Sequence, residues 1–159
     1  MSGRAAIAGI GQTEFSKESG RSELRLACEA VRTALSDAGL DAADVDGLIT
    51  FTMDTSEEME IARNLGVREV SMFSRVPYGG GAAAGTVLQA AMAVATGVAE
   101  VVVCYRAFNE RSGNRFGNMS GRIATLPLWL SWYAPYGLMT PAAWVALHAR
   151  RYMHAYGVT

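Results

Sequence analysis

The stretch from Val76 to Ala99 constrains the fold more than any other part of the sequence, because it contains no charged side chain. It starts with a glycine turn, Gly79 to Gly81, and continues as an alanine-rich run that ends at Gly97. Ala, Leu, Gln and Met favour helix, whereas glycine disfavours it and is preferred at a left-handed C-terminal cap. The run is apolar around the whole helix circumference, so we expect a helix buried on all sides.

The residues around this helix predict parallel strands. Val101, Val102 and Val103 are continuous and β-branched, as in a strand covered on both faces. With a further strand at 69–74, the segment becomes a right-handed βαβ crossover. A ligand can approach the backbone closely where a glycine turn opens a helix, beside unpaired amide hydrogens and the positive end of the helix dipole. We therefore predict a substrate-binding site formed by Tyr78, Gly79, Gly80 and Gly81.

Two simpler interpretations of the same stretch stand beside this one. The alanine-rich helix can pack closely against a neighbouring element with no ligand involved, and the glycines then form only a flexible turn. A membrane span needs about 20 apolar residues. We expect no span here, because alanine contributes little hydrophobicity, glycines interrupt the run, and no positively charged flank biases its ends.

Composition excludes several classes of protein. The 159 residues fit one domain, and a hydrophobic content of 50% is enough for a core. A formal net charge of −1 gives no basic field for nucleic acid. The positions of Cys28 and Cys104 fit neither a disulfide framework nor a metal site, and His148 and His154 lie too far apart on a helix for a metal pair. Without an apolar signal segment at the N-terminus, we expect a cytoplasmic protein with no metal.

The first half alternates strands and helices, which predicts an α/β fold with a mostly parallel sheet. Gly9-Ile10-Gly11 is not a dinucleotide-binding motif, because its third glycine position falls on Glu14 and no helix opens there. A metal pair formed by Asp44 and Asp46 is disfavoured, because loop carboxylates of this kind more often cap a helix and face solvent. We expect strands at 4–10, 47–52, 69–74 and 101–103, a helical turn at 41–45, and helices at 22–38, 56–65 and between the glycine turn and Gly97.

The segment 107–141 breaks this alternation. Arg and Asn residues alternate with glycines and are followed by the aromatic cluster Trp129, Trp132, Tyr133 and Tyr136. A segment of this length without regular structure is usually a lid, a binding loop or a dimer contact. Stacking on single-stranded nucleic acid is disfavoured, because no basic surplus accompanies the aromatic residues. A last helix should begin at Pro141 and end at Gly157, with an inner stripe of Ala142, Val145, Ala146, Ala149 and Met153.

The order of these motifs resembles the thiolase superfamily, and specifically its sterol-carrier, lipid-transfer type of thiolase-like protein. The resemblance implies a thiolase-like N-terminal lobe with α/β/α layers and a mostly parallel sheet. We therefore expect residues 1–159 to be the N-terminal domain of a longer protein, with 107–141 as a long loop or lid. The matching segments are 5–15, 38–47, 81–104 and 151–159.

One departure from the thiolase pattern concerns the chemistry. Thiolases place a nucleophilic cysteine at the start of the buried helix, where the helix dipole lowers the thiol pKa. The matching position here is about Gly80, and no Cys, Ser or Thr replaces it. We expect Cys104 not to substitute, because it lies at the far end of the following strand. The resemblance therefore implies no catalytic residue within this chain, and no acyl-cysteine chemistry.

A thiolase-like protein without this cysteine resembles the actinobacterial steroid side-chain aldolases, which cleave a β-hydroxyacyl-CoA by retro-aldol chemistry. Such cleavage needs a base for the hydroxyl proton and a donor at the thioester enolate. The resemblance implies acid and base tyrosines in the C-terminal half, no covalently bound cofactor, and coenzyme A as part of the substrate. It also implies a homodimer with an OB-fold and zinc-ribbon protein partner.

Two other functions stay open at this stage. One is a non-catalytic lipid-transfer or acyl-CoA-binding protein, in which the glycine turn accommodates an acyl chain. The other is an acetyl-CoA acetyltransferase, which is disfavoured because no cysteine lies between Cys28 and Cys104.

Overall fold

The computed structural model describes residues 3–51, 54–77, 81–112 and 131–159. The chain divides into two compact units, Met1–Asn109 and Glu110–Thr159, which are described separately below. Tyr78, Gly79 and Gly80 of the predicted site lie outside the described residues, as does Trp129 of the aromatic cluster.

The first unit is built on a three-stranded parallel sheet with the order β2-β1-β3. Its strands are β1 (Gly47–Phe51), β2 (Met72–Val76) and β3 (Val102–Cys104). Gly47 at the start of β1 is in register with Met72 of β2 and with Val102 of β3. In the central strand, Leu48 and Ile49 are fully buried. The predicted parallel sheet is therefore confirmed.

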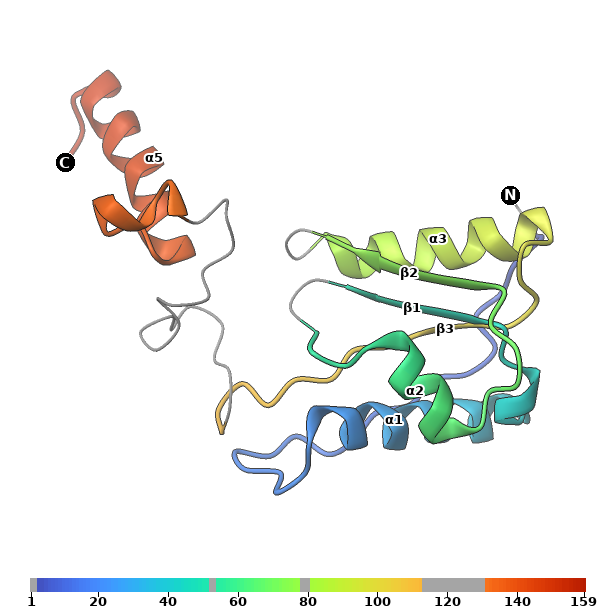
Figure 1. Cartoon of the computed structure of the whole chain (residues 1–159). Helices are drawn as coiled ribbons and strands as arrows, with labels where there is room; N and C mark the ends of the chain where they lie inside the picture. The colour runs from blue at the N-terminus through green and yellow to red at the C-terminus, as the bar shows by residue number, and fades with distance from the viewer. Residues whose placement is uncertain (1–2, 52–53, 78–80, 113–130) are drawn as a thin grey trace. The chain divides into compact units, whose positions relative to one another are not determined.

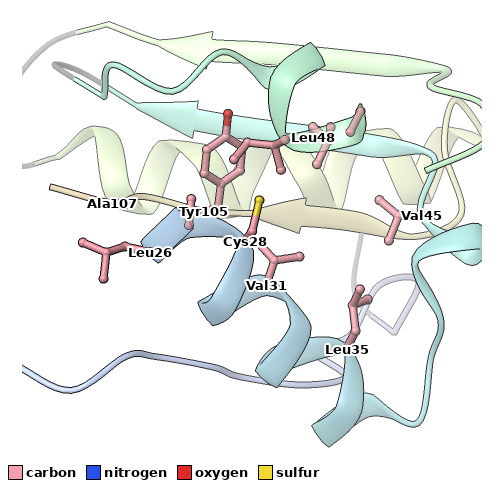
Figure 2. Packing of buried hydrophobic residues seen from close by; sticks show 11 residues of the cluster. Leu26, Cys28, Val31, Leu35, Val45, Leu48, Tyr105 and Ala107 are labelled. Atoms are coloured by element: carbon pink, nitrogen blue, oxygen red, sulfur yellow. The ribbon is translucent and has the colours of Figure 1, made fainter. Parts of the chain in front are cut away.

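Helices cover both faces of this sheet (Figure 1). The helices α1 (Glu23–Ala38) and α2 (Glu58–Leu65) lie on one face, and α3 (Ala82–Thr96) lies on the other. Figure 2 shows Leu26, Cys28, Val31 and Leu35 along the side of α1 that faces the sheet, where they pack in one buried cluster with Leu48 of β1. These layers confirm the α/β/α architecture expected from the sequence.

The predicted helix ends are confirmed by their caps. The Ser22 hydroxyl accepts a hydrogen bond from the amide of Arg25 at 3.2 Å, as an N-cap should. Gly39 and Gly97 adopt left-handed backbone angles, with φ of 70° and 76°, directly after α1 and α3. The expected turn at 41–45 is the short 3-10 helix η1 (Ala42–Asp44), where the Asp44 carboxylate accepts from the Asp41 amide at 2.8 Å.

The strand predicted at 4–10 is absent from the structure. This segment forms no strand and instead runs along α1, where the Ile10 amide donates to the Asp37 carboxylate at 2.9 Å. Its alternating pattern is real, but a strand needs a neighbour to satisfy its amides and carbonyls. Ile7 and Ile10 are each 76% exposed, so the apolar side chains face away from the core. An alternating pattern therefore predicts a strand correctly only where another strand lies beside the segment.

Two predicted strands are displaced along the sequence. The strand expected at 69–74 occupies Met72–Val76, and the one expected at 101–103 occupies Val102–Cys104 and is only partly buried. Asp46 explains both shifts, because the residues before each strand bind to it. Its carbonyl accepts from the amides of Ser71 and Met72, and its carboxylate accepts from the amides of Glu100 and Val101.

The expectation that the alanine-rich helix is buried on all sides is wrong. Ala82, Thr86 and Ala93 of α3 are buried, whereas Leu88 and Met92 are 53% and 48% exposed. The helix packs on the sheet with one side, and its other side is exposed in this chain. Within the described ranges, no helix is long and apolar enough to cross a bilayer.

The second unit contains the short 3-10 helix η3 (Ala134–Tyr136) and the predicted last helix, α5 (Pro141–Tyr156). Thr140 caps α5 by accepting from the Ala143 amide at 3.2 Å, and the Trp144 indole donates to the Leu138 carbonyl at 2.7 Å. The predicted inner stripe is not buried, since Val145 is 66% exposed.

The close packing of the N-terminal segment on α1 predicts a large effect of one methyl group. A Cβ atom at Gly11 would lie 2.3 Å from the Ala30 carbonyl oxygen, whereas one at Gly85 would meet only the Val76 side chain at 3.3 Å. We expect Gly11→Ala to lower the free energy of unfolding by about 1–3 kcal/mol through overpacking. Gly85→Ala should be neutral or stabilising, because alanine is the better helix former. Urea denaturation of both variants measures this, and equal stabilities would contradict the packing.

Candidate functional site

The carboxyl ends of the three strands meet at one edge of the sheet, which is where parallel α/β sheets bind ligands. Residues 54–58 follow β1, and residues 105–109 follow β3. The helix α3 follows β2 and runs back along the sheet, so its N-terminus lies at the same edge. The predicted glycine turn ends where α3 begins, so the site predicted from the sequence would lie at this edge.

Gly81 is the one predicted site residue that the structure describes. It precedes α3 with φ of −68° and ψ of −18°, and among the described residues no side chain caps the helix. The first turn contains no acidic residue. A Cβ atom built on Gly81 meets no described atom within 4 Å. Backbone amides at a helix start without a side-chain cap can bind a ligand.

A polar cluster lies at the same edge, on the side of the sheet covered by α1 and α2. Its acceptor residues Asp54, Ser56 and Glu58 are buried, whereas the side chain of Arg75 is 38% exposed. We call it the Arg75 cluster, and its guanidinium is the central group. Arg75 donates to the carbonyl oxygen of Asp54, to that of Ser56 at 2.9 Å, and to the Glu58 carboxylate at 3.2 and 3.3 Å. The members of the cluster are Asp54, Ser56, Glu58, Arg75 and Tyr105.

Asp54 and Tyr105 extend the cluster to the chain that follows β3. The Asp54 carboxylate accepts from the Ser56 amide at 2.8 Å and from the Ala107 amide at 3.0 Å. The Tyr105 hydroxyl donates to the Ser56 carbonyl at 3.3 Å. Asp54 and Ser56 are almost fully buried, so these bonds replace the water that the groups would otherwise bind. The segments after β1 and β3 are thus joined.

The charges of the cluster shift two pKa values. Burial lowers the pKa of Arg75, but the hydrogen bond and charge of Glu58, with smaller contributions from Tyr105 and Asp54, raise it above the usual value. Burial raises the pKa of Tyr105, and the nearby carboxylates of Glu58 and Asp54 raise it further. The phenol stays protonated at neutral pH, so Tyr105 is a hydrogen-bond donor and not a general base.

A second arginine lies at this edge after β3. The Arg106 guanidinium is held 4.5 Å from the centre of the Phe51 ring and 5.2 Å from that of Phe108. Within the described ranges, no carboxylate forms an ion pair with it, and its side chain is exposed. Cation–π contacts of this kind hold a positive charge in place while leaving its hydrogens accessible.

The structure corrects the expectation for Cys104. Sequence reasoning separated it from the start of α3, but the strand and the helix run in opposite directions, so Cys104 at the carboxyl end of β3 lies at the same edge as the start of α3. Burial raises the pKa of the Cys104 thiol, although Thr86 opposes this. A protonated thiol is a poor nucleophile. Cys104 not replacing the missing cysteine therefore stays a prediction, and its reason is now the raised pKa of the thiol and not its distance from α3.

Sequence reasoning missed the Arg75 cluster altogether. Acidic residues follow the strand that ends at Phe51, and Arg75 lies near the end of the next strand. Carboxyl ends of parallel strands meet at one edge, so this spacing was a usable signal. The contact between Asp54 and Ala107, 53 residues apart, left no local trace in the sequence.

Comparison with known proteins places this geometry in a family. Over 163 aligned residues that include the whole chain, it is 66% identical to the steroid side-chain-cleaving aldolase of Thermomonospora curvata. Over the same length it is 61% identical to the 17-hydroxy-3-oxo-4-pregnene-20-carboxyl-CoA lyase of Mycobacterium tuberculosis. The chain spans 42% of the length of each relative. No protein-family model matches it.

Solved structures give the same result. The Ltp2-ChsH2(DUF35) aldolase superposes with a TM-score of 0.80 at 66% identity, covering 99% of this chain and 40% of that chain. Along its whole length, the chain therefore resembles the thiolase-like steroid side-chain aldolases. The SCP2-thiolase like protein type 1 of Mycobacterium smegmatis is more distant, with a TM-score of 0.53 at 26% identity over 62% of this chain and 22% of that chain. The family expected from the motif order is thus confirmed.

In this thiolase-like chain, Thr50 and Ser56 carry buried hydroxyl oxygens with no hydrogen-bond partner among the described residues. Leaving a buried polar atom unpaired costs about 1–3 kcal/mol. We expect Thr50→Val, which keeps the branched shape, to raise the free energy of unfolding by about 1 kcal/mol.

Thermal and urea denaturation measure this change. Thr33→Val is the matched control, because the Thr33 hydroxyl is exposed and donates to the Glu29 carbonyl at 3.0 Å. A loss of stability in Thr50→Val would show that its hydroxyl is in fact paired.

Proposed function

We propose that this chain is the N-terminal part of a thiolase-fold lyase that cleaves a β-hydroxyacyl-CoA with a steroid side chain. The identity of 66% and 61% to a steroid side-chain-cleaving aldolase and to a steroid CoA lyase, across the whole chain, carries this proposal. The absence of Cys, Ser and Thr from the glycine turn supports chemistry without an acyl-enzyme.

The proposed reaction needs two proton transfers and one charge-stabilising site. A base takes the proton of the substrate hydroxyl, the carbon–carbon bond breaks, and the hydroxyl carbon becomes a ketone. The electron pair of the broken bond becomes a thioester enolate, which a hydrogen-bond donor stabilises and an acid then protonates at carbon. The products are a ketone and a shorter acyl-CoA.

This chain would supply the binding surface for that reaction. Tyr78, Gly79, Gly80 and Gly81 would line the substrate pocket, with the uncapped start of α3 beside them. Tyr105 is unsuited to proton transfer, because its pKa is raised. We therefore place the acid and base tyrosines in sequence beyond residue 159, as the resemblance to the aldolases implies.

The proposal extends to partners and location. The similar solved structure carries ChsH2(DUF35) in its name beside Ltp2, which supports a protein partner for this chain as well. We propose the OB-fold and zinc-ribbon type of partner, a homodimeric core, and a cytoplasmic location. We also propose that residues 1–159 form one domain and that 107–141 is its loop or lid.

One observation favours a second candidate function, an acyl-CoA-binding or lipid-transfer protein. At the carboxyl edge, burial raises the pKa of the Cys104 thiol and of the Tyr105 phenol, so neither group is suited to act as a base at neutral pH. An acetyltransferase is not favoured, because the edge lacks a reactive cysteine.

Turnover by the full-length protein with its partner separates these candidates. We expect a β-hydroxy steroid acyl-CoA to yield a ketone and a short acyl-CoA at catalytic rates. Chromatography measures the formation of both products. Binding of the same ester without either product would replace the lyase by the binding protein.

The glycine turn is tested by filling it. We expect Gly80→Leu to abolish binding of the CoA ester, because the added side chain would occupy the proposed pocket, while the folded fraction stays near that of the unchanged protein. Ser36→Leu, which adds the same side chain on an exposed part of α1, is the control. Calorimetric titration measures binding, and an unchanged affinity in Gly80→Leu would remove the turn from the site.

A further inference from the structure

One guanidinium, that of Arg75 in β2, binds the segment that follows β1. We propose that Arg75 is a positioning residue for the reaction proposed above: it fixes residues 54–58 at the carboxyl edge and thereby shapes the substrate-binding edge. This inference rests on the proposed function, and it concerns a residue that would not itself touch the reacting atoms.

The pattern of its bonds points to positioning. Arg75 donates to two main-chain carbonyls, those of Asp54 and Ser56, in addition to its ion pair with Glu58. A bond to a carbonyl holds the backbone itself, whereas the ion pair holds only a side chain. The planar fork of an arginine can serve these acceptors together, which the compact ammonium of a lysine cannot.

Residues 54–58, which Arg75 binds, in turn form hydrogen bonds with residues 105–107 after β3. The Asp54 carboxylate accepts from the Ala107 amide at 3.0 Å, and the Tyr105 hydroxyl donates to the Ser56 carbonyl at 3.3 Å. Asp54 is 4% exposed and Ser56 is 2% exposed, so water cannot take over these bonds. A shift of the loop would therefore displace residues 105–107 with it.

Arg75 is also adjacent to the helix that opens the candidate site. The next residue, Val76, ends β2, and its Cγ1 atom would lie 3.3 Å from a Cβ at Gly85 in the first turns of α3. The end of β2 therefore packs against α3 on one face of the sheet, while Arg75 binds the loop on the other. Arg75 is placed to keep the loop and the start of α3 in one arrangement.

The test is Arg75→Lys in the full-length protein with its partner. Lysine keeps the charge and the ion pair with Glu58 but loses the fork to the two carbonyls. We expect KM for the steroid CoA ester to rise on the order of tenfold, with kcat/KM falling by about 10- to 100-fold, as misplacement of a site by about 1 Å does. Arg25→Lys, an exposed arginine paired with Glu29, is the control and should keep the original KM.

The KM value separates positioning from a purely structural role. A variant that merely unfolds in part has fewer active molecules, so its apparent kcat falls while its KM stays unchanged. An unchanged KM in Arg75→Lys would overturn the proposal. Should that variant not fold, Asp54→Asn tests the same linkage, because an amide nitrogen cannot accept from one of the two backbone amides, and the same rise in KM is expected.

Failure of this inference differs from failure of the proposed function. The unchanged protein alone decides whether the ester is cleaved. If the unchanged protein binds the ester without cleaving it, the dissociation constant of the ester is measured in place of KM. A higher dissociation constant in Arg75→Lys than in Arg25→Lys would then support the role of Arg75.

Discussion

The burial of β1 is the constraint on which the rest of the first unit depends. Leu48, Ile49 and Thr50 are each fully buried, with a strand on either side and helices over both faces. A buried strand must pair all its backbone groups, so β1 needs both β2 and β3 in register. The parallel direction that results brings three carboxyl ends to one edge. The chain leaving that edge must still satisfy its own amides and carbonyls, and the Arg75 cluster does so.

The residues at the carboxyl edge of the sheet determine its chemistry. It presents fixed positive charge and donor groups, at Arg106 and at the uncapped start of α3. Its thiol and its buried phenol, Cys104 and Tyr105, both have raised pKa values and stay protonated. Such an edge suits the binding of a polar or anionic ligand and the stabilisation of developing negative charge. It is unsuited to nucleophilic attack, in agreement with the absence of a cysteine from the glycine turn.

The predictions that were correct depended on signals within a few residues. Ser22 before α1 and Gly39 after it set that helix almost to the residue, because both caps act on adjacent backbone groups. The strand predicted at 4–10 was wrong. Alternation of apolar residues shows that a segment can form a strand, but not that a partner strand lies beside it. The start of β2 was three residues early for a similar reason, because bonds to Asp46 decide where pairing begins.

The sequence by itself determined the α/β class, the α3 crossover, the helix caps and the family, because each depends on local pattern or on the order of motifs. Only the tertiary structure decided which side chains meet at the carboxyl edge. Arg75 binds groups 17 to 21 residues away, and Asp54 binds an amide 53 residues away. Bonds of that separation form only after the sheet has aligned its strands, and their geometry is set by strand register and burial.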